Sequence, residues 1–339
     1  MRYQWIDSLK GLGMILVIAT HSSLSTVFPE LSVMLTAGYM GMFFVLSGYT
    51  AKKEPLGQAI RKKANRLLIP YFFYGIAITS LFSIIEIASG SININEWIGL
   101  LYSRYAIHPL GCSDNTFLLR TAAPLWFLTA MFMAYLCFYI YVGLKGLVSK
   151  CLCVVLYIIA TISLHQLGIL LPWSIDTSFL CALLIIVGYE FSPYAMKIYK
   201  KRFSYFVTLL ILLGVYVTIV TYNGNANLSV GYYGYLGAFS IFLYFILSVL
   251  ITVLYSELLK LCSNKGGMNF LAFIGKHSLR LMCIHMPFIV VLQFFFGKFG
   301  VIGVFATFIC SFVMSLVTSL IIERFCNRFA NKYLFLKYL

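Results

Sequence analysis

Three ionisable side chains share the first apolar stretch of the sequence. Asp7, Lys10 and His21 recur with Met14 and Val17 at steps of three and four residues, which places all five on one face of a helix. Ionisable groups inside an apolar span are costly, so they are functional candidates. A neutral imidazole suits proton transfer because its ordinary pKa, about 6.5, lies near operating pH. The spacing leaves two interpretations open: a catalytic stripe, or an anchoring lysine and a histidine that only bonds a neighbouring helix.

These residues need a membrane-embedded framework to position them. Of the 339 residues, 61% are hydrophobic and 10% are charged, against about 25% charged in ordinary globular chains. Too few polar residues remain to cover a water-exposed surface, which excludes a soluble enzyme, a disordered chain and a secreted disulfide scaffold. The net charge of +15 does not indicate nucleic-acid binding, because the basic residues sit between long apolar runs. The nine cysteines form no CxxC or Cys/His cluster, so no metal site is expected.

The apolar runs predict an all-α fold, a polytopic bundle of membrane helices. A span needs about 20 mostly apolar residues, since inside lipid every backbone group must bond within its own helix. Cutting the sequence at charged and Gly/Pro/Asn-rich positions gives about ten such segments, at 9–28, 32–51, 67–89, 123–143, 151–170, 177–191, 205–222, 234–255, 278–297 and 301–323. No internal repeat is visible in the sequence, so we expect a single membrane domain over residues 1–339.

The basic residues predict the orientation of these segments. With the amino terminus in the cytoplasm, all but three of the 25 Lys and Arg residues fall on the cytoplasmic side, the exceptions being Arg104, Arg120 and Lys298. This bias predicts that both termini are cytoplasmic. The longest outer loop is then 90–122. A second, near 223–233, is rich in Asn, Gly and Tyr, and its aromatic side chains either stack on sugar rings or anchor the chain at the membrane interface.

Four further motifs follow the first stretch in a fixed order. They are FFVLSG at 43–48, the basic run RKKANRLLIPY at 61–71, PLWFL at 124–128, and IGKHSL at 274–279 with His285 shortly after. Together with residues 7–21, this order resembles the integral-membrane acyltransferase family 3, the O-acetyltransferases of bacterial surface glycans. Two departures stand out: Lys10 replaces a more common Arg, and residues 129–131 lack the acidic residue that many relatives carry there.

The resemblance implies a membrane O-acyltransferase in a bacterial cytoplasmic membrane. Its donor would be cytoplasmic acetyl-CoA or another acyl-CoA, and its acceptor a hydroxyl of an extracytoplasmic glycan or lipid-linked sugar. His21 would act as the general base or would itself carry the acyl group, and the sequence does not separate these two roles. Lys10 would belong to the same catalytic stripe.

Donor binding would fall to the basic run, which we expect to be a loop that opens the third span, and to a small-residue pair. The phosphates of acyl-CoA suit charge-assisted hydrogen bonds from four residues, Arg61, Lys62, Lys63 and Arg66. Ser47 and Gly48 would let the backbone approach the thioester closely. Both features have a plainer interpretation, because cytoplasmic loops are basic for topological reasons and small residues favour helix packing.

Four residues are candidates for supporting roles. Asp7 lies on the catalytic stripe, and Trp126 belongs to the PLWFL motif. His285 shares a helical face with Ser278 and Met282, and Pro287 follows, where a kink would free backbone carbonyls. We expect His285 either to orient the donor or to bond across to the first span.

Other functions also fit a chain of this kind. Ten spans, outer aromatic residues and intramembrane charges would suit a polysaccharide or small-metabolite transporter or flippase. The Lys10 and His21 stripe with a basic run nearby favours the enzyme. A non-catalytic subunit of a polysaccharide synthase is a third alternative, in which His21 would be dispensable. The sequence does not decide the acceptor sugar, the acyl chain or whether the chain forms a homo-oligomer.

Overall fold

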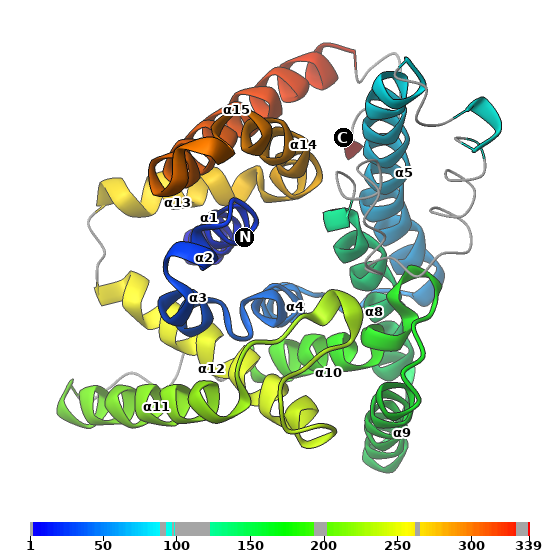
Figure 1. Ribbon diagram of the computed structural model, residues 1–339. Helices are drawn as coiled ribbons and strands as arrows, with labels where there is room; N and C mark the ends of the chain where they lie inside the picture. Colours follow the sequence, from blue (N-terminus) through cyan, green and yellow to red (C-terminus); the bar gives the residue numbers. More distant parts are fainter. Residues whose placement is uncertain are drawn as a thin grey trace.

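The fold is a bundle of α-helices (Figure 1). The structure is a computed structural model that describes residues 3–88, 93–96, 98, 123–192, 202–261, 265–329 and 338–339. Its helices are α1 (Gln4–His21), α2 (Leu24–Val27), α3 (Pro29–Thr36), α4 (Tyr39–Tyr49), α5 (Leu56–Ala88), α8 (Trp126–Gly143), α9 (Leu147–Gln166), α10 (Ile175–Phe191), α11 (Arg202–Asn223), α12 (Phe239–Leu261), α13 (Lys265–Lys276), α14 (Ser278–Phe296) and α15 (Gly300–Phe329). The described residues contain no β-strand, which confirms the predicted all-α class.

Seven helical stretches among the described residues are long and apolar enough to cross a membrane. One of them, Ser278–Phe329, contains both α14 and α15, because only a short turn separates these helices. The apolar part of α11, Val207–Asn223, is shorter than the others. Each of the predicted segments nevertheless falls on a helix or a pair of consecutive helices. The chain is therefore a polytopic membrane helix bundle. The predicted outer loop 90–122 lies almost wholly outside the described residues.

The second predicted span is broken instead of continuous. It consists of α3 and α4, which meet at Gly38, a residue with a φ of +81°. A Cβ atom at Gly38 would lie 2.8 Å from the backbone of Leu247 and Ser248 in α12. Glycine therefore serves two purposes at the break, the left-handed backbone and the close approach of α12.

The basic run predicted as a loop is helical, which corrects that expectation. α5 begins at Leu56, directly after Pro55, so residues 61–66 form its second and third turns. The physical reason is composition: Gln, Ala, Lys, Arg and Leu all favour helix, and a proline ahead of the first turn is compatible with a helix start. Helical geometry then decides which basic side chains share a face.

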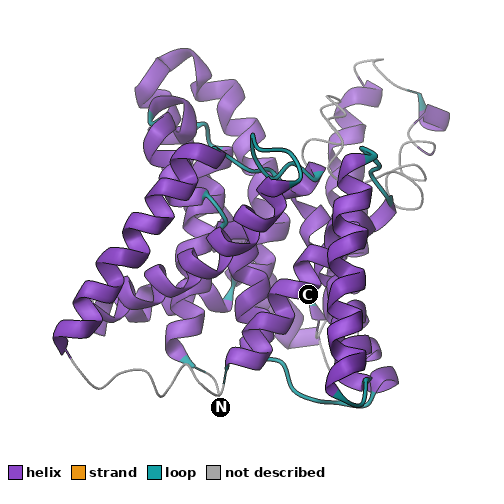
Figure 2. Cartoon of the chain, turned by 90° about the horizontal axis from the view of Figure 1, so that it is seen from below, coloured by secondary structure: helices purple, strands orange, loops and turns teal. Residues whose placement is uncertain are grey.

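The bundle has an amino-terminal end and an opposite end. At the amino-terminal end, α1 begins and α4 ends, with the Trp5 and Tyr49 rings 5.1 Å apart between centroids. At the opposite end, α1 ends at His21 and α4 begins at Tyr39. Figure 2 shows the amino terminus at the lower edge of the bundle. α10 runs against α4, since Gly48 near the end of α4 lies against the backbone of Ile185 and Tyr189 near the end of α10.

Candidate active site

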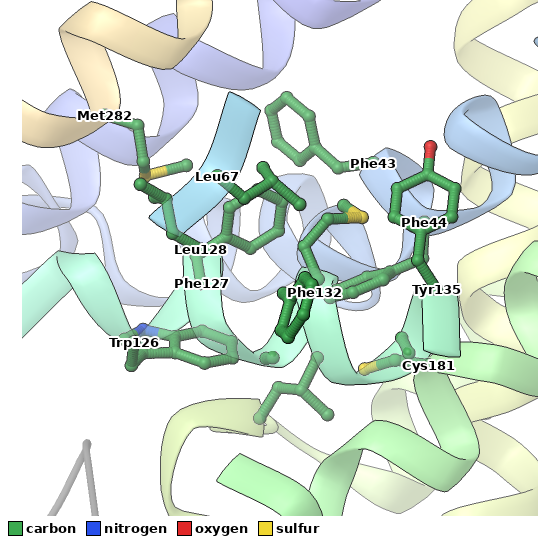
Figure 3. Packing of buried hydrophobic residues seen from close by; sticks show 14 of the residues in the cluster. Phe43, Phe44, Leu67, Trp126, Phe127, Leu128, Phe132, Tyr135, Cys181 and Met282 are labelled. Carbon is green, nitrogen blue, oxygen red and sulfur yellow. The ribbon is translucent and has the colours of Figure 1, made fainter. Parts of the chain in front are cut away.

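A cavity of about 260 Å³ opens near the amino-terminal end, between α1, α4, α5, α8 and α14. Five of the predicted site residues line it, and they come from four separate helices: Lys10, Ser47, Lys63, Arg66 and Ser278. Its apolar walls are built from the aromatic core, in which the Phe127 ring lies 5.7 Å from that of Phe43 and 5.3 Å from that of Phe44 (Figure 3). The fold thus brings together motifs that are far apart in the sequence.

Tyr135 is a cavity residue that the sequence analysis missed. The Lys63 ammonium nitrogen lies 3.5 Å from the centroid of the Tyr135 ring, a cation–π distance. The Tyr135 hydroxyl donates to the backbone carbonyl of Ser47, at 3.5 Å. A signal was present, because Phe127, Met131 and Tyr135 recur at steps of four residues and all line the cavity. This stripe fixes the face of α8 that meets the basic residues.

A second, more basic cavity of about 470 Å³ adjoins the first. Both cavities are lined by Lys63, Arg66 and Leu279, so the two cations stand where they meet. The second cavity adds four residues that can be cationic: Lys62, Lys276, His277 and Arg280. Two acceptors in its wall meet Arg280: the Glu323 carboxylate lies 3.5 Å from the guanidinium, and the Leu339 oxygen accepts from Arg280 Nε at 2.6 Å. An excess of positive charge therefore surrounds a space suited to a polyanion.

The basic run divides by helical face. Lys63 and Arg66 are one turn apart and line both cavities, whereas Arg61 is exposed and lines neither. Lys62 lines the second cavity and donates to Glu54 at 2.8 Å. This hydrogen bond from Lys62 lowers the pKa of the Glu54 carboxyl below its usual value. Of the four predicted donor-binding cations, Lys63 and Arg66 have the most direct access to the cavity beside Lys10.

Two histidines from different spans meet toward the opposite end. The ring centroids of His21 and His285 are 5.4 Å apart, with the ring planes 43° to each other. The His285 side chain is completely buried, and its Nδ1 donates to the Leu281 carbonyl at 2.8 Å. Its Nε2 has no hydrogen-bond partner among the described residues. Because a carbonyl only accepts, the proton of neutral His285 is on Nδ1, and Nε2 is the atom that can accept a proton.

Gln293 fixes the backbone beside this pair. Its amide nitrogen donates to the His21 carbonyl at 3.2 Å and to the Ser23 hydroxyl at 3.1 Å. Gln293 is a polar residue in an apolar stretch, two turns after His285 on α14. Gln293 was not among the predicted site residues, although a polar side chain at that spacing from a histidine is a signal for an interhelical hydrogen bond.

Two methionines lie between the cavity and the histidine pair. Met14 and Met282 both line the cavity, and both are almost fully buried. Met14 precedes His21 by two turns on α1, and Met282 precedes His285 by one turn on α14. Figure 3 shows Met282 beside Leu67 at this side of the aromatic core. Methionine is flexible and fills irregular space, so this is the part of the wall that yields most easily.

Three predicted residues lie in the surrounding framework and not on the cavity wall. Gly48 packs against the α10 backbone, where a Cβ atom would collide with the Ile185 carbonyl. Trp126 is 8% exposed, and its ring lies 6.0 Å from that of Phe127 (Figure 3). Asp7 is 7% exposed on α1, where α1 crosses α13. Their placement gives each a structural setting, and functional roles for them stay predictions.

The comparison with protein families decides the class of the molecule. A family model described as an acyltransferase domain matches residues 3–324. The chain belongs to the acyltransferase 3 family. This match spans nearly the whole sequence and shows a membrane acyltransferase, which decides against the transporter alternative. No curated protein and no solved structure matches this acyltransferase 3 chain.

Proposed function

We propose that the protein transfers an acyl group, acetyl in the simplest case, from acyl-CoA to a hydroxyl of an extracytoplasmic glycan or lipid-linked sugar. Acyl-CoA enters at the amino-terminal end, which is cytoplasmic in this proposal. Its phosphates bind at the junction of the two basic cavities, beside Lys63 and Arg66. The acceptor approaches from the opposite end of the bundle.

The main support for this proposal is the histidine pair, His21 and His285, at the far side of the cavity. A buried imidazole whose Nδ1 proton is fixed by a carbonyl presents a lone pair at Nε2. Its neighbour His21 ends α1 and is only half-buried, so it is the member of the pair that an incoming hydroxyl reaches. His285 acts as a positioning residue for His21, and His21 contacts the reacting atoms.

The chemistry needs one proton transfer and one exchange at the carbonyl carbon. His21 removes the proton from the acceptor hydroxyl as its oxygen attacks the thioester carbonyl. The C–O bond forms, the C–S bond breaks, and the thiolate of coenzyme A leaves with a proton from the imidazolium. In the alternative route, the His21 imidazole nitrogen attacks the thioester carbonyl first, so that an N–C bond forms while the C–S bond breaks and the thiolate of coenzyme A leaves. The acceptor hydroxyl then takes the acyl group from that nitrogen and gives its proton to the released imidazole.

The thioester must pass the methionines to reach His21. At 1.5 Å per residue, Lys10 and His21 are about 16 Å apart along α1. The long flexible arm of coenzyme A can cover such a distance while its phosphates remain at Lys63 and Arg66. Lys10 then lies beside the arm, and Ser278 lines the same cavity.

Comparative mass spectrometry of surface glycans tests the proposal. Cells that carry the gene should show glycan repeats heavier by one acyl group than cells that lack it. The same cells with His21→Gln should lack the added group at equal protein abundance. Identical glycans with and without the gene would contradict the proposed reaction.

A further inference from the structure

A polar cavity of about 260 Å³ lies at the opposite end of the bundle, away from the basic cavities. It is formed by the end of α9, the start of α10 and the connection 224–238 between α11 and α12. Its polar wall contains a carboxylate, an imidazole, a hydroxyl and two phenols: Asp176, His165, Thr161, Tyr232 and Tyr233. Carboxylates bind sugar hydroxyls, and aromatic rings pack against sugar faces.

The side chains of this cavity are held in place by the protein. Asp176 is 7% exposed, and its Oδ1 accepts from the Leu171 backbone N–H at 3.0 Å. His165 Nδ1 donates to the Gly231 carbonyl at 3.1 Å, and its ring lies 5.3 Å from that of Tyr233. Burial raises the pKa of Tyr233 well above its usual value, so its hydroxyl stays protonated. The site is therefore built before any ligand binds.

An apolar groove of about 470 Å³ adjoins the polar cavity along the bundle. It lies between α9, α10 and α12, and Thr161 lines both spaces. Its wall is aliphatic and aromatic, for example Ile158, Leu183 and Phe242, and it reaches Glu190 near the other end of α10. Two adjoining spaces thus offer hydroxyl-binding groups at one end and a lipid-like lining along the membrane span.

We propose that the polar cavity and the apolar groove together bind a lipid-linked saccharide, with sugar in the cavity and the aliphatic anchor in the groove. The proposal rests on the proposed function, because it names the form in which the acceptor is presented. A free saccharide would leave the groove unused, and a bilayer phospholipid would leave the sugar-binding cavity unused. The cavity lies at the same end of the bundle as His21, so it holds part of the saccharide away from the reacting hydroxyl.

Photo-crosslinking in living cells tests this proposal on the full chain. p-Benzoylphenylalanine is placed at Tyr232 in the cavity or at Ile158 in the groove, and adducts are identified by mass spectrometry after irradiation. The expected result is the same adduct at both positions, with fragments that contain both sugar and aliphatic chain. As a matched control, Ile309 is 55% exposed on α15, and this position should capture phospholipid only.

A charge variant strengthens the test. Asp176→Asn keeps the side-chain size and an acceptor for the Leu171 N–H, but it removes the negative charge. The yield of sugar-containing adduct at Tyr232 should fall roughly tenfold at equal protein abundance. An unchanged yield would show that the sugar is not held by this cavity.

The outcomes also separate this proposal from the proposed function. Phospholipid alone at Ile158, sugar without lipid at Tyr232, or no sugar adduct would overturn the lipid-linked saccharide site. If glycans in the same strain are still acylated, acyl transfer stands without it. Capture of a lipid-linked saccharide in a strain with no acylated glycan would uphold the binding site and contradict the acyl transfer.

Discussion

The position of each basic residue on the α5 helix, and not its closeness in sequence, decides whether it reaches the cavities. Lys63 and Arg66 face both cavities, while Arg61, two positions before Lys63, is exposed and lines neither. Phosphate binding needs cations that reach the ligand, so only part of the basic run meets that need. Arg61 therefore serves as an internal control for its neighbours.

Replacing Lys63 or Arg66 with Gln should weaken donor binding. Each substitution removes a charge-assisted hydrogen bond but leaves the histidine pair intact, so the KM for acyl-CoA should rise roughly tenfold with little change in kcat. Arg61→Gln removes the same charge from the same part of α5 and should keep a KM close to wild type. Steady-state kinetics on the protein in nanodiscs measures both. Equal KM values in all three variants would contradict donor binding at the junction.

A separate prediction concerns Met14 and Met282, which lie between the cavity and the histidine pair. Met282→Trp should fill the space between the cavity and His285, so acyl-CoA still binds while transfer slows by at least roughly tenfold. Met282→Leu nearly conserves volume and should behave like wild type. Kinetics that separate kcat from KM check this. A Trp variant with normal kcat would show that the thioester does not take this route.

At the residue scale, the sequence carries information where one helix holds the whole pattern. Spacing puts Lys10 on one face with Met14, and Ser278 on one face with Met282, because a helical face is defined locally. The contact of Lys63 with Tyr135 could not be predicted in this way, since it depends on how α5 and α8 pack. For His285, the sequence left two roles open, orienting the donor or bonding across to the first span. The structure places its ring 5.4 Å from that of His21, while its Nε2 has no hydrogen-bond partner among the described residues.

At the scale of elements, close helix crossings explain the small residue in the FFVLSG motif. Gly48 of α4 and Gly188 of α10 each lie against the backbone of the other helix, so neither position has room for a side chain. This crossing holds α4 at the depth that places Ser47 on the cavity wall. The contacts of Gly48 thus give it a packing role, and a role beside the thioester stays a prediction.

Gly48→Ala should destabilise the protein. The new methyl group would collide with the Ile185 carbonyl, and overpacking of this kind costs about 1–3 kcal/mol. Gly214→Ala in α11 is the matched control, because nothing lies within 4 Å of its Cβ position, and Ala there should be neutral or slightly stabilising. Thermal unfolding in detergent compares the two. Equal melting temperatures would contradict the tight crossing.

The helices were easier to predict than their ends. Hydropathy located every segment because a membrane span needs a long apolar run. It missed the start of α5 at Leu56, since charged helix formers carry no hydropathy signal. It also missed the break at Gly38, which depends on contact with α12. Local composition therefore predicts which segments are helices, whereas the break within the second span depends on tertiary contacts.

For the whole molecule, the direction of transfer depends on which end of the bundle is cytoplasmic. The charge bias predicts that the amino-terminal end is inside, which would put the basic cavities on the side where acyl-CoA is made. The polar cavity at 224–238 would then face outward. This orientation stays a prediction, and thiol labelling tests it directly.

Cysteines introduced at the two ends should react differently. In a background with Cys112, Cys151 and Cys262 changed to Ser, an impermeant maleimide should label Asn225→Cys in intact cells and Lys53→Cys only after permeabilisation. Both positions are exposed, whereas native Cys326 is only 4% exposed and would resist labelling on either side. Labelling of Lys53→Cys in intact cells would reverse the orientation.

The most direct test of the whole account is acyl transfer by purified protein with His21 altered. Wild type and His21→Gln are placed in nanodiscs with isotope-labelled acetyl-CoA and membrane extract as the source of acceptor, and transfer of label is timed. Gln keeps a hydrogen-bonding side chain but cannot take a proton near neutral pH. We predict a rate lower by roughly 10²–10⁴ with an unchanged melting temperature. A His21→Gln protein that transfers label at the wild-type rate would remove His21 from the mechanism and contradict the account.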